Sequence, residues 1–154
     1  MDIASISTIV AAGGVLIGVV LAYLEVRSLV RTRQTELVMG LYSTYGSKGF
    51  QEAYTKFETQ EYKDFNGYVK KHGLSSMETV CILYEGIGVL LHKKLIDITL
   101  IDDLFSTPIK LTWEEMKPII EGARKHYNRP QIYEWFEYLY NELQKREQTL
   151  QAQQ

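Results

Sequence analysis

The first long segment of the chain reads IASISTIVAAGGVLIGVVLAYL, residues Ile3 to Leu24, and contains no Asp, Glu, Lys, Arg or His. A helix rises ~1.5 Å per residue, so this segment reaches ~33 Å, enough to cross a bilayer core of ~30 Å. A secretory signal would begin with basic residues and end in small residues at a cleavage site. Here the chain begins Met1-Asp2 and the segment ends in Ala22-Tyr23-Leu24-Glu25. We therefore predict an uncleaved membrane anchor, in preference to a signal peptide or a buried core helix.

Three arginines follow the anchor closely, Arg27, Arg31 and Arg33, and no basic residue precedes it. Basic residues next to a span favour the cytoplasmic side. We therefore predict a single-pass protein of the cell membrane with Met1 outside and the C-terminal domain in the cytoplasm. The same arginines are predicted to contact lipid headgroups, either as general topology charges or as a specific anionic-lipid site.

Small residues recur every four positions along the anchor, at Gly14, Gly18 and Ala22. A small-xxx-small ridge lets two helix backbones approach closely in lipid. Because Gly and Ala are also common in spans in general, the pattern has a plain alternative reading. We interpret it as a packing face, toward a second copy or toward another membrane subunit.

The remainder of the chain predicts an all-α protein, because apolar residues recur at helical spacing and no segment alternates with a period of two. The anchor is expected to continue into a cytoplasmic bundle of about six helices. The predicted parts are a transmembrane anchor at 1–25, a helical extension from the membrane at 26–46, a helical domain at 47–144 and a polar tail at 145–154. The tail is predicted to be either a solvated helix extension or a disordered segment.

Capping residues and helix breakers mark the boundaries. Ser75 and Thr112 each begin a capping-box pattern, with a Glu three residues later. Asp97 is a plausible cap for the helix that follows it, and Pro108 is expected to end that helix. The other predicted stops are 46–49, Gly73 and 128–130, and the last helix is expected to begin near Pro130.

The segment 76–93 is the most apolar of the domain and is predicted to be its central helix. Glycine costs ~1 kcal/mol relative to Ala inside a helix, so Gly86 and Gly88 predict close contact with a neighbouring helix. Glu85 is a carboxylate in this apolar setting and requires a partner, because a buried unpaired charge is very costly. We predict a buried ion pair between Glu85 and Arg124.

The last helix carries more aromatic side chains than one buried stripe requires. Tyr133, Tyr138 and Tyr140 flank the stripe. We interpret them as a partner surface, although aromatic residues at helical spacing are more often part of a core.

Motifs that indicate chemistry are missing from the sequence. The net charge of −2 does not favour nucleic-acid binding. The chain has one cysteine, Cys81, which has apolar neighbours, and its three histidines do not form a metal-binding motif. Nucleotide-binding loops and nucleophile-elbow motifs are also missing. We predict no catalytic residue, no metal site and no cofactor, and therefore a protein that is not an enzyme.

Part of the sequence resembles a known family. The likeness runs through 83–90 and 133–139 and covers most of the region from Ser75 to Leu143. Between these runs it includes Leu95-Ile96-Asp97, Phe105, Trp113-Glu114, Pro118-Ile119-Ile120 and Arg124. The family is an uncharacterised prokaryotic group of single-span membrane proteins with a helical cytoplasmic domain, catalogued as a domain of unknown function. The resemblance implies topology and no activity.

Three functions remain for comparison. The first is an accessory or regulatory subunit that binds integral membrane subunits and a cytoplasmic subunit of a larger complex. The chain also resembles a small accessory subunit of a membrane enzyme such as the archaeal sodium-pumping tetrahydromethanopterin S-methyltransferase. The second is a membrane-tethered sensor or enzyme domain with a pocket near Glu85 and Arg124. The third is a homo-oligomeric membrane anchor.

Overall fold

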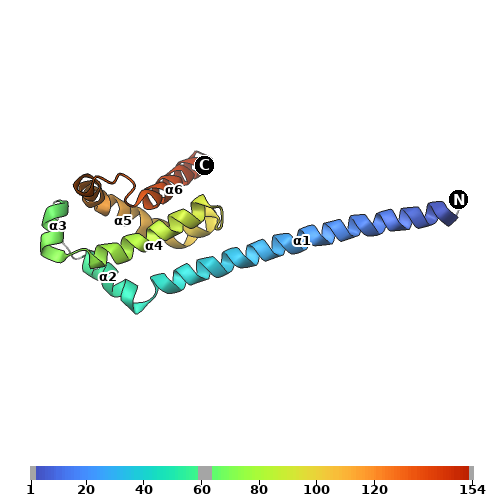
Figure 1. The fold of residues 1–154 in the computed structure, drawn as a ribbon, viewed down its shortest axis with the longest axis horizontal. Helices are drawn as coiled ribbons and strands as arrows, with labels where there is room; N and C mark the ends of the chain where they lie inside the picture. The colour runs from blue at the N-terminus through green and yellow to red at the C-terminus, as the bar shows by residue number, and fades with distance from the viewer. Residues whose placement is uncertain (1–2, 59–63, 153–154) are drawn as a thin grey trace. The chain divides into compact units, whose positions relative to one another are not determined.

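A computed structural model describes residues 3–58 and 64–152 of the chain. Within these ranges the chain is almost entirely helical and contains no strand (Figure 1). The helices are α1 (Ile3–Tyr45), α2 (Lys48–Glu58), α3 (Phe65–His72), α4 (Ser75–His92), α5 (Ile98–Tyr127) and α6 (Glu134–Gln151). The predicted all-α class is confirmed. Five helices follow α1 in the described residues, where about six were expected.

The chain divides into two compact units, Met1–Glu36 and Leu37–Gln154. The first contains most of α1. The most apolar 18-residue window within Gly13–Tyr45 has a mean hydropathy of 1.7 and contains no buried residue. It is long and apolar enough to span a membrane. Met1 lies outside the described residues, and the orientation of the span stays a prediction.

The second unit is a helical domain, named here by its residues Leu37–Gln154, with α4 at its centre. Its closely packed helix pairs are α4 with α6, α2 with α4, α5 with α6, and α3 with α5. Aromatic rings join the layers: the ring of Phe136 lies 5.0 Å from those of both Tyr84 and Trp113. Helices α3 and α4 meet at 119°, and the two together are also long and apolar enough to cross a membrane. Six residues of α4 are buried in the domain core.

Helix α5 runs through both of its prolines, so the prediction that Pro108 ends a helix is wrong. Proline removes one backbone hydrogen bond and disfavours the helix locally. Ile101, Phe105 and Ile109 are fully buried at helical spacing around it, and this burial outweighs the local cost. Thr112, predicted as a cap, is a buried residue within the same helix.

Of the other predicted boundaries, some are confirmed and two are wrong. Asp97 caps α5 by accepting a hydrogen bond from the Thr99 N–H at 2.7 Å. Gly73 ends α3 with φ of 72°, and Asn128 ends α5 in the left-handed conformation. Helix α4 is not capped by the Ser75 side chain. Helix α6 starts at Glu134 rather than near Pro130.

The polar tail continues α6 as a helix as far as Gln151, which corresponds to the first of the two predicted alternatives. Side-chain ion pairs join it to α5. Arg146 Nε lies 2.9 Å from Asp102 Oδ2, and Lys110 Nζ lies 2.7 Å from Glu147 Oε2. The end of α6 is therefore attached to the domain.

Candidate functional site

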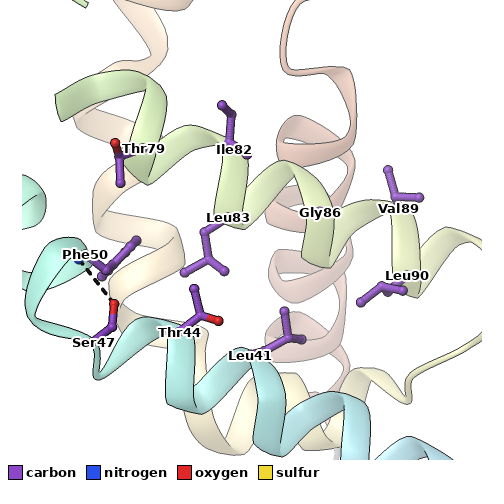
Figure 2. A pocket seen from close by; sticks show the side chains of 10 residues that line it. All are labelled: Leu41, Thr44, Ser47, Phe50, Thr79, Ile82, Leu83, Gly86, Val89 and Leu90. Carbon is purple, nitrogen blue, oxygen red and sulfur yellow. Dashed lines mark hydrogen bonds between the residues drawn. The ribbon is translucent and has the colours of Figure 1, made fainter. Parts of the chain in front are cut away.

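An apolar cleft of about 600 Å³ opens between the last turns of α1, the start of α2 and one side of α4 (Figure 2). Leu41 and Thr44 point from α1 toward α4, and Leu83 points back from α4. None of the lining side chains is ionisable. The lining residues are Leu41, Thr44, Ser47, Phe50, Thr79, Ile82, Leu83, Gly86, Val89 and Leu90.

The two long walls of the cleft are held by different neighbours. The α1 wall is fixed through Tyr45, whose ring lies 5.6 Å from that of Phe105 on α5 and 5.1 Å from that of Phe50 on α2. The α4 wall is packed against α6 and α2, whereas α1 is in none of the closely packed helix pairs of the described residues. An apolar group that enters the cleft therefore need not first separate two closely packed helices.

Two glycines of α4 have opposite surroundings. A Cβ at Gly88 would overlap the backbone carbonyl of Trp135, so the predicted close contact with a neighbouring helix is confirmed there. A Cβ at Gly86 would meet nothing within 4 Å, so the same prediction is wrong for Gly86. Gly86 instead leaves an open place in the α4 wall of the cleft.

Ile82, one turn before Gly86, is the residue of the cleft that the sequence reading missed. Its side chain is 63% exposed and points away from α1 (Figure 2). It lies off the buried stripe of α4, beside the fully buried Cys81. A large apolar residue off the stripe, next to a glycine on the same face, was the available signal.

The predicted ion pair between Glu85 and Arg124 is wrong, because each side chain has another partner at the start of α6. Glu85 Oε2 accepts a hydrogen bond from the Phe136 N–H at 2.7 Å. Arg124 donates from Nη1 to Glu137 Oε2 at 2.7 Å and from Nε to the Ile132 carbonyl at 2.9 Å. A helix start leaves N–H groups unsatisfied, and α6 has no side-chain cap of its own. Both residues therefore fix α6 in place.

Burial raises the pKa of the Glu85 carboxyl above its ordinary value of 4.5, against the lowering effect of the Phe136 and Trp135 N–H groups. The folded protein thus holds this proton more tightly than the unfolded chain does. The contribution of Glu85 to the free energy of unfolding is therefore largest at low pH and falls as pH rises through the interval from the ordinary to the raised pKa.

Replacing Glu85 by glutamine should flatten this pH dependence, because the amide does not titrate and its carbonyl still accepts from Phe136. Near neutral pH the variant is expected to be as stable as the wild type or more stable. Thermal melts from about pH 4 to about pH 8 would measure the difference. Asp97 and Asp102 have lowered pKa values and act in the opposite direction, but they are the same in both proteins. Parallel melting curves across this range would contradict the prediction.

The three tyrosines predicted as an exposed partner surface are each only partly exposed. Tyr133 packs against the core, and burial raises the pKa of its hydroxyl. Tyr138 lies with its ring 5.5 Å from that of His92. The ring of Tyr140 lies 5.9 Å from that of Trp113, and its hydroxyl donates a hydrogen bond to Glu114. Their main contacts are therefore within the domain.

The predicted residues of the N-terminal segment are all exposed. Gly14 and Gly18 have nothing within 4 Å of a Cβ position, and Ala22 is exposed beside them on the same helix. Arg27, Arg31 and Arg33 are exposed as well. These side chains remain accessible to lipid or to a partner helix.

The described residues contain no group of three or more His, Cys, Asp or Glu side chains that would hold a metal ion. Cys81 is buried, and this burial raises the pKa of its thiol, so its thiolate form is disfavoured. The features that remain as candidates for a function are the cleft and the contacts of Glu85 and Arg124 at the start of α6.

Comparison with known proteins identifies the family. A search of curated proteins and a search of solved structures each find no match. One family model matches residues 9–143, which includes α4, the cleft and most of α6. The chain belongs to this family, which is described as a domain of unknown function (DUF4760).

Proposed function

We propose that this protein is a non-enzymatic accessory subunit that is anchored in the membrane by α1 and docks on other membrane proteins through the cleft between α1 and α4. The observation that carries the proposal is the lining of the cleft. It offers apolar side chains and a few hydroxyls but no ionisable group for acid, base or nucleophilic chemistry. An open apolar groove between two helices is a common receptor for the apolar face of a third.

The N-terminal part of α1 supplies the attachment. Its exposed apolar side chains suit lipid, and the arginines that follow favour an outside N-terminus and a cytoplasmic domain. The exposed face of Gly14, Gly18 and Ala22 is the surface on which a partner span would pack. A host of the kind represented by the archaeal sodium-pumping tetrahydromethanopterin S-methyltransferase, with several membrane subunits and a cytoplasmic one, would use both surfaces.

Changing either surface should reduce the recovery of co-purifying proteins. Gly14→Leu with Gly18→Leu places bulk on the span face, and Gly86→Ile fills the open place in the cleft. The measurement is purification of the tagged full-length chain from native membranes in mild detergent, with every co-purifying protein quantified, including a second copy of this chain carrying another tag. Each variant is expected to insert normally and to lose partners.

Two control substitutions distinguish the loss of docking from a general effect of changing a side chain on the same helix. Val15→Leu with Val19→Leu alters the adjacent face of the span, where both side chains are exposed. Ser75→Ala alters an exposed position of α4 that does not line the cleft. Both controls should retain the partners. Unchanged recovery of all co-purifying proteins in both test variants would overturn the proposal.

A further inference from the structure

We propose that the face of α4 that carries Ile82 and Gly86, on the α4 side of the cleft, packs antiparallel on the same face of a second copy across a two-fold axis. This rests on the proposed function only in taking the α4 side of the cleft as a docking surface. A knob and a hole lie on the same face of α4: Ile82 projects, 63% exposed, and Gly86 leaves an open place four residues later. Residues four apart in a helix lie about 6 Å apart on one side.

A two-fold axis between these two positions makes them self-complementary. Ile82 of each copy then lies over Gly86 of the other, so that one fit is made twice, as an isologous interface requires. The same register sets Thr79 opposite Val89, and both of these residues line the cleft. Because Gly86 lacks a side chain, the two helices can approach at the short end of the usual range of about 8–10 Å.

The charges at the ends of α4 are compatible with this antiparallel arrangement. The N-terminal turn carries the exposed Glu78, and the exposed Lys93 and Lys94 follow the C-terminus. Antiparallel pairing brings Lys93 within about one helical turn of Glu78 of the other copy. The helix dipoles are also opposed, which is favourable.

Two other sets of charged side chains near α4 could affect the charge of this interface. The basic pair Lys70 and Lys71 lies on α3, whose axis turns from that of α4 by 119°. Glu85 already accepts a hydrogen bond from Phe136 at the start of α6. Neither therefore defines the charge along the face that carries Ile82 and Gly86.

Membrane attachment helps a small interface of this kind. Two copies confined to one bilayer meet at a high effective concentration, so a modest contact between helices gives a populated dimer.

Cross-linking of the full-length chain in lipid nanodiscs tests the register. Chains with Ile82→Cys, mixed with differently tagged chains with Gly86→Cys, are expected to form disulfides on mild oxidation, as is the pair Thr79→Cys with Val89→Cys. Same-position pairs are separated along the helices by about 6 Å at 82 and 86 and by about 15 Å at 79 and 89, as well as by about 8 Å between axes. This is beyond disulfide reach, so they should not cross-link. The native Cys81 is buried and serves as the unreactive control.

An exchange of knob and hole tests the contact itself. Gly86→Ile alone should weaken the dimer by about tenfold or more, because two isoleucines would then collide. Adding Ile82→Gly to the same chain moves the knob and the hole to each other's places and should restore the dimer. Fluorescence energy transfer between labelled copies gives the dimer fraction, and thermal melts confirm that each variant folds.

The outcomes divide cleanly. Cross-links between the predicted pairs, with recovery in the exchanged variant, support the second copy as occupant. Cross-links between same-position pairs, no cross-links, or no recovery in a folded exchanged variant would overturn it. If cross-links fail while Gly86→Ile still loses another co-purifying protein, a different partner occupies the cleft and the proposed function stands.

Discussion

Replacing Gly88 by alanine is expected to destabilise the helical domain by about 3 kcal/mol. A Cβ at this position would overlap the carbonyl of Trp135, which is backbone and has no rotamer that moves it away. The obstacle is also fixed, because the next residue, Phe136, donates its N–H to Glu85 on α4 itself. Relief therefore requires a shift of α6 against α4, which are extensively packed together.

Gly86→Ala is the matched control for this prediction, two residues away in the same helix. It meets open space, and alanine is the better helix former, so it should stabilise the domain by up to about 1 kcal/mol. Urea unfolding of the full-length chain in detergent, followed by far-ultraviolet circular dichroism, compares the two. Changes of the same sign in both variants would contradict the assignment of these glycines.

These two glycines also show the limit of the sequence. A glycine inside an apolar helix predicts a position at which a side chain would not fit. At Gly88 a neighbouring backbone leaves no space for a side chain, whereas Gly86 borders an open place in a surface cleft. The sequence pattern is the same at both glycines. Their surroundings differ because of the positions of α6 and of the last turns of α1, which the pattern does not show.

Features set by nearby residues were predictable. The cap at Asp97 and the stops at Gly73 and Asn128 depend on backbone within a few residues, and all three are confirmed. Pro108 shows the opposite case, because its local preference is overridden by burial of the side chains around it. The all-α class was predictable for the same reason as the caps: helical spacing is a local pattern.

The candidate cleft was not predictable from spacing. Its walls come from residues about forty positions apart, such as Leu41 and Leu83, and are held by residues outside the cleft, such as Phe105. The partners of Glu85 and Arg124 were missed for a related reason. Both bind groups at the start of α6, including a backbone N–H and a carbonyl, and backbone groups leave no trace in a sequence.

Replacing Arg124 by methionine is expected to lower the free energy of unfolding by about 2–3 kcal/mol. The substitution keeps most of the apolar stem but removes both hydrogen bonds that this side chain makes. The Ile132 carbonyl and the Glu137 carboxylate then lose their donor. The Arg124 side chain is only 18% exposed, so water replaces these contacts poorly.

The consequence should reach α6 as a whole, because its N-terminus depends on side chains from other helices. The connection before it already holds Asn128 and Tyr133 with positive φ, a conformation that non-glycine residues adopt at some cost. Without Arg124 this connection retains the contact of Glu85 with α6 but loses the one from α5. Hydrogen exchange at the first turns of α6 is therefore expected to rise more than exchange in α4.

Arg129→Met is the matched control, since Arg129 lies in the same connection but is exposed. It removes an equal charge and should change the free energy of unfolding by less than about 0.5 kcal/mol. Glu137→Gln should have an intermediate effect, because the amide still accepts from Arg124 without its charge. Chemical unfolding of the three variants under one set of conditions measures this order. Equal losses for Arg124→Met and Arg129→Met would show that net charge, and not the fixing of α6, stabilises this end of the domain.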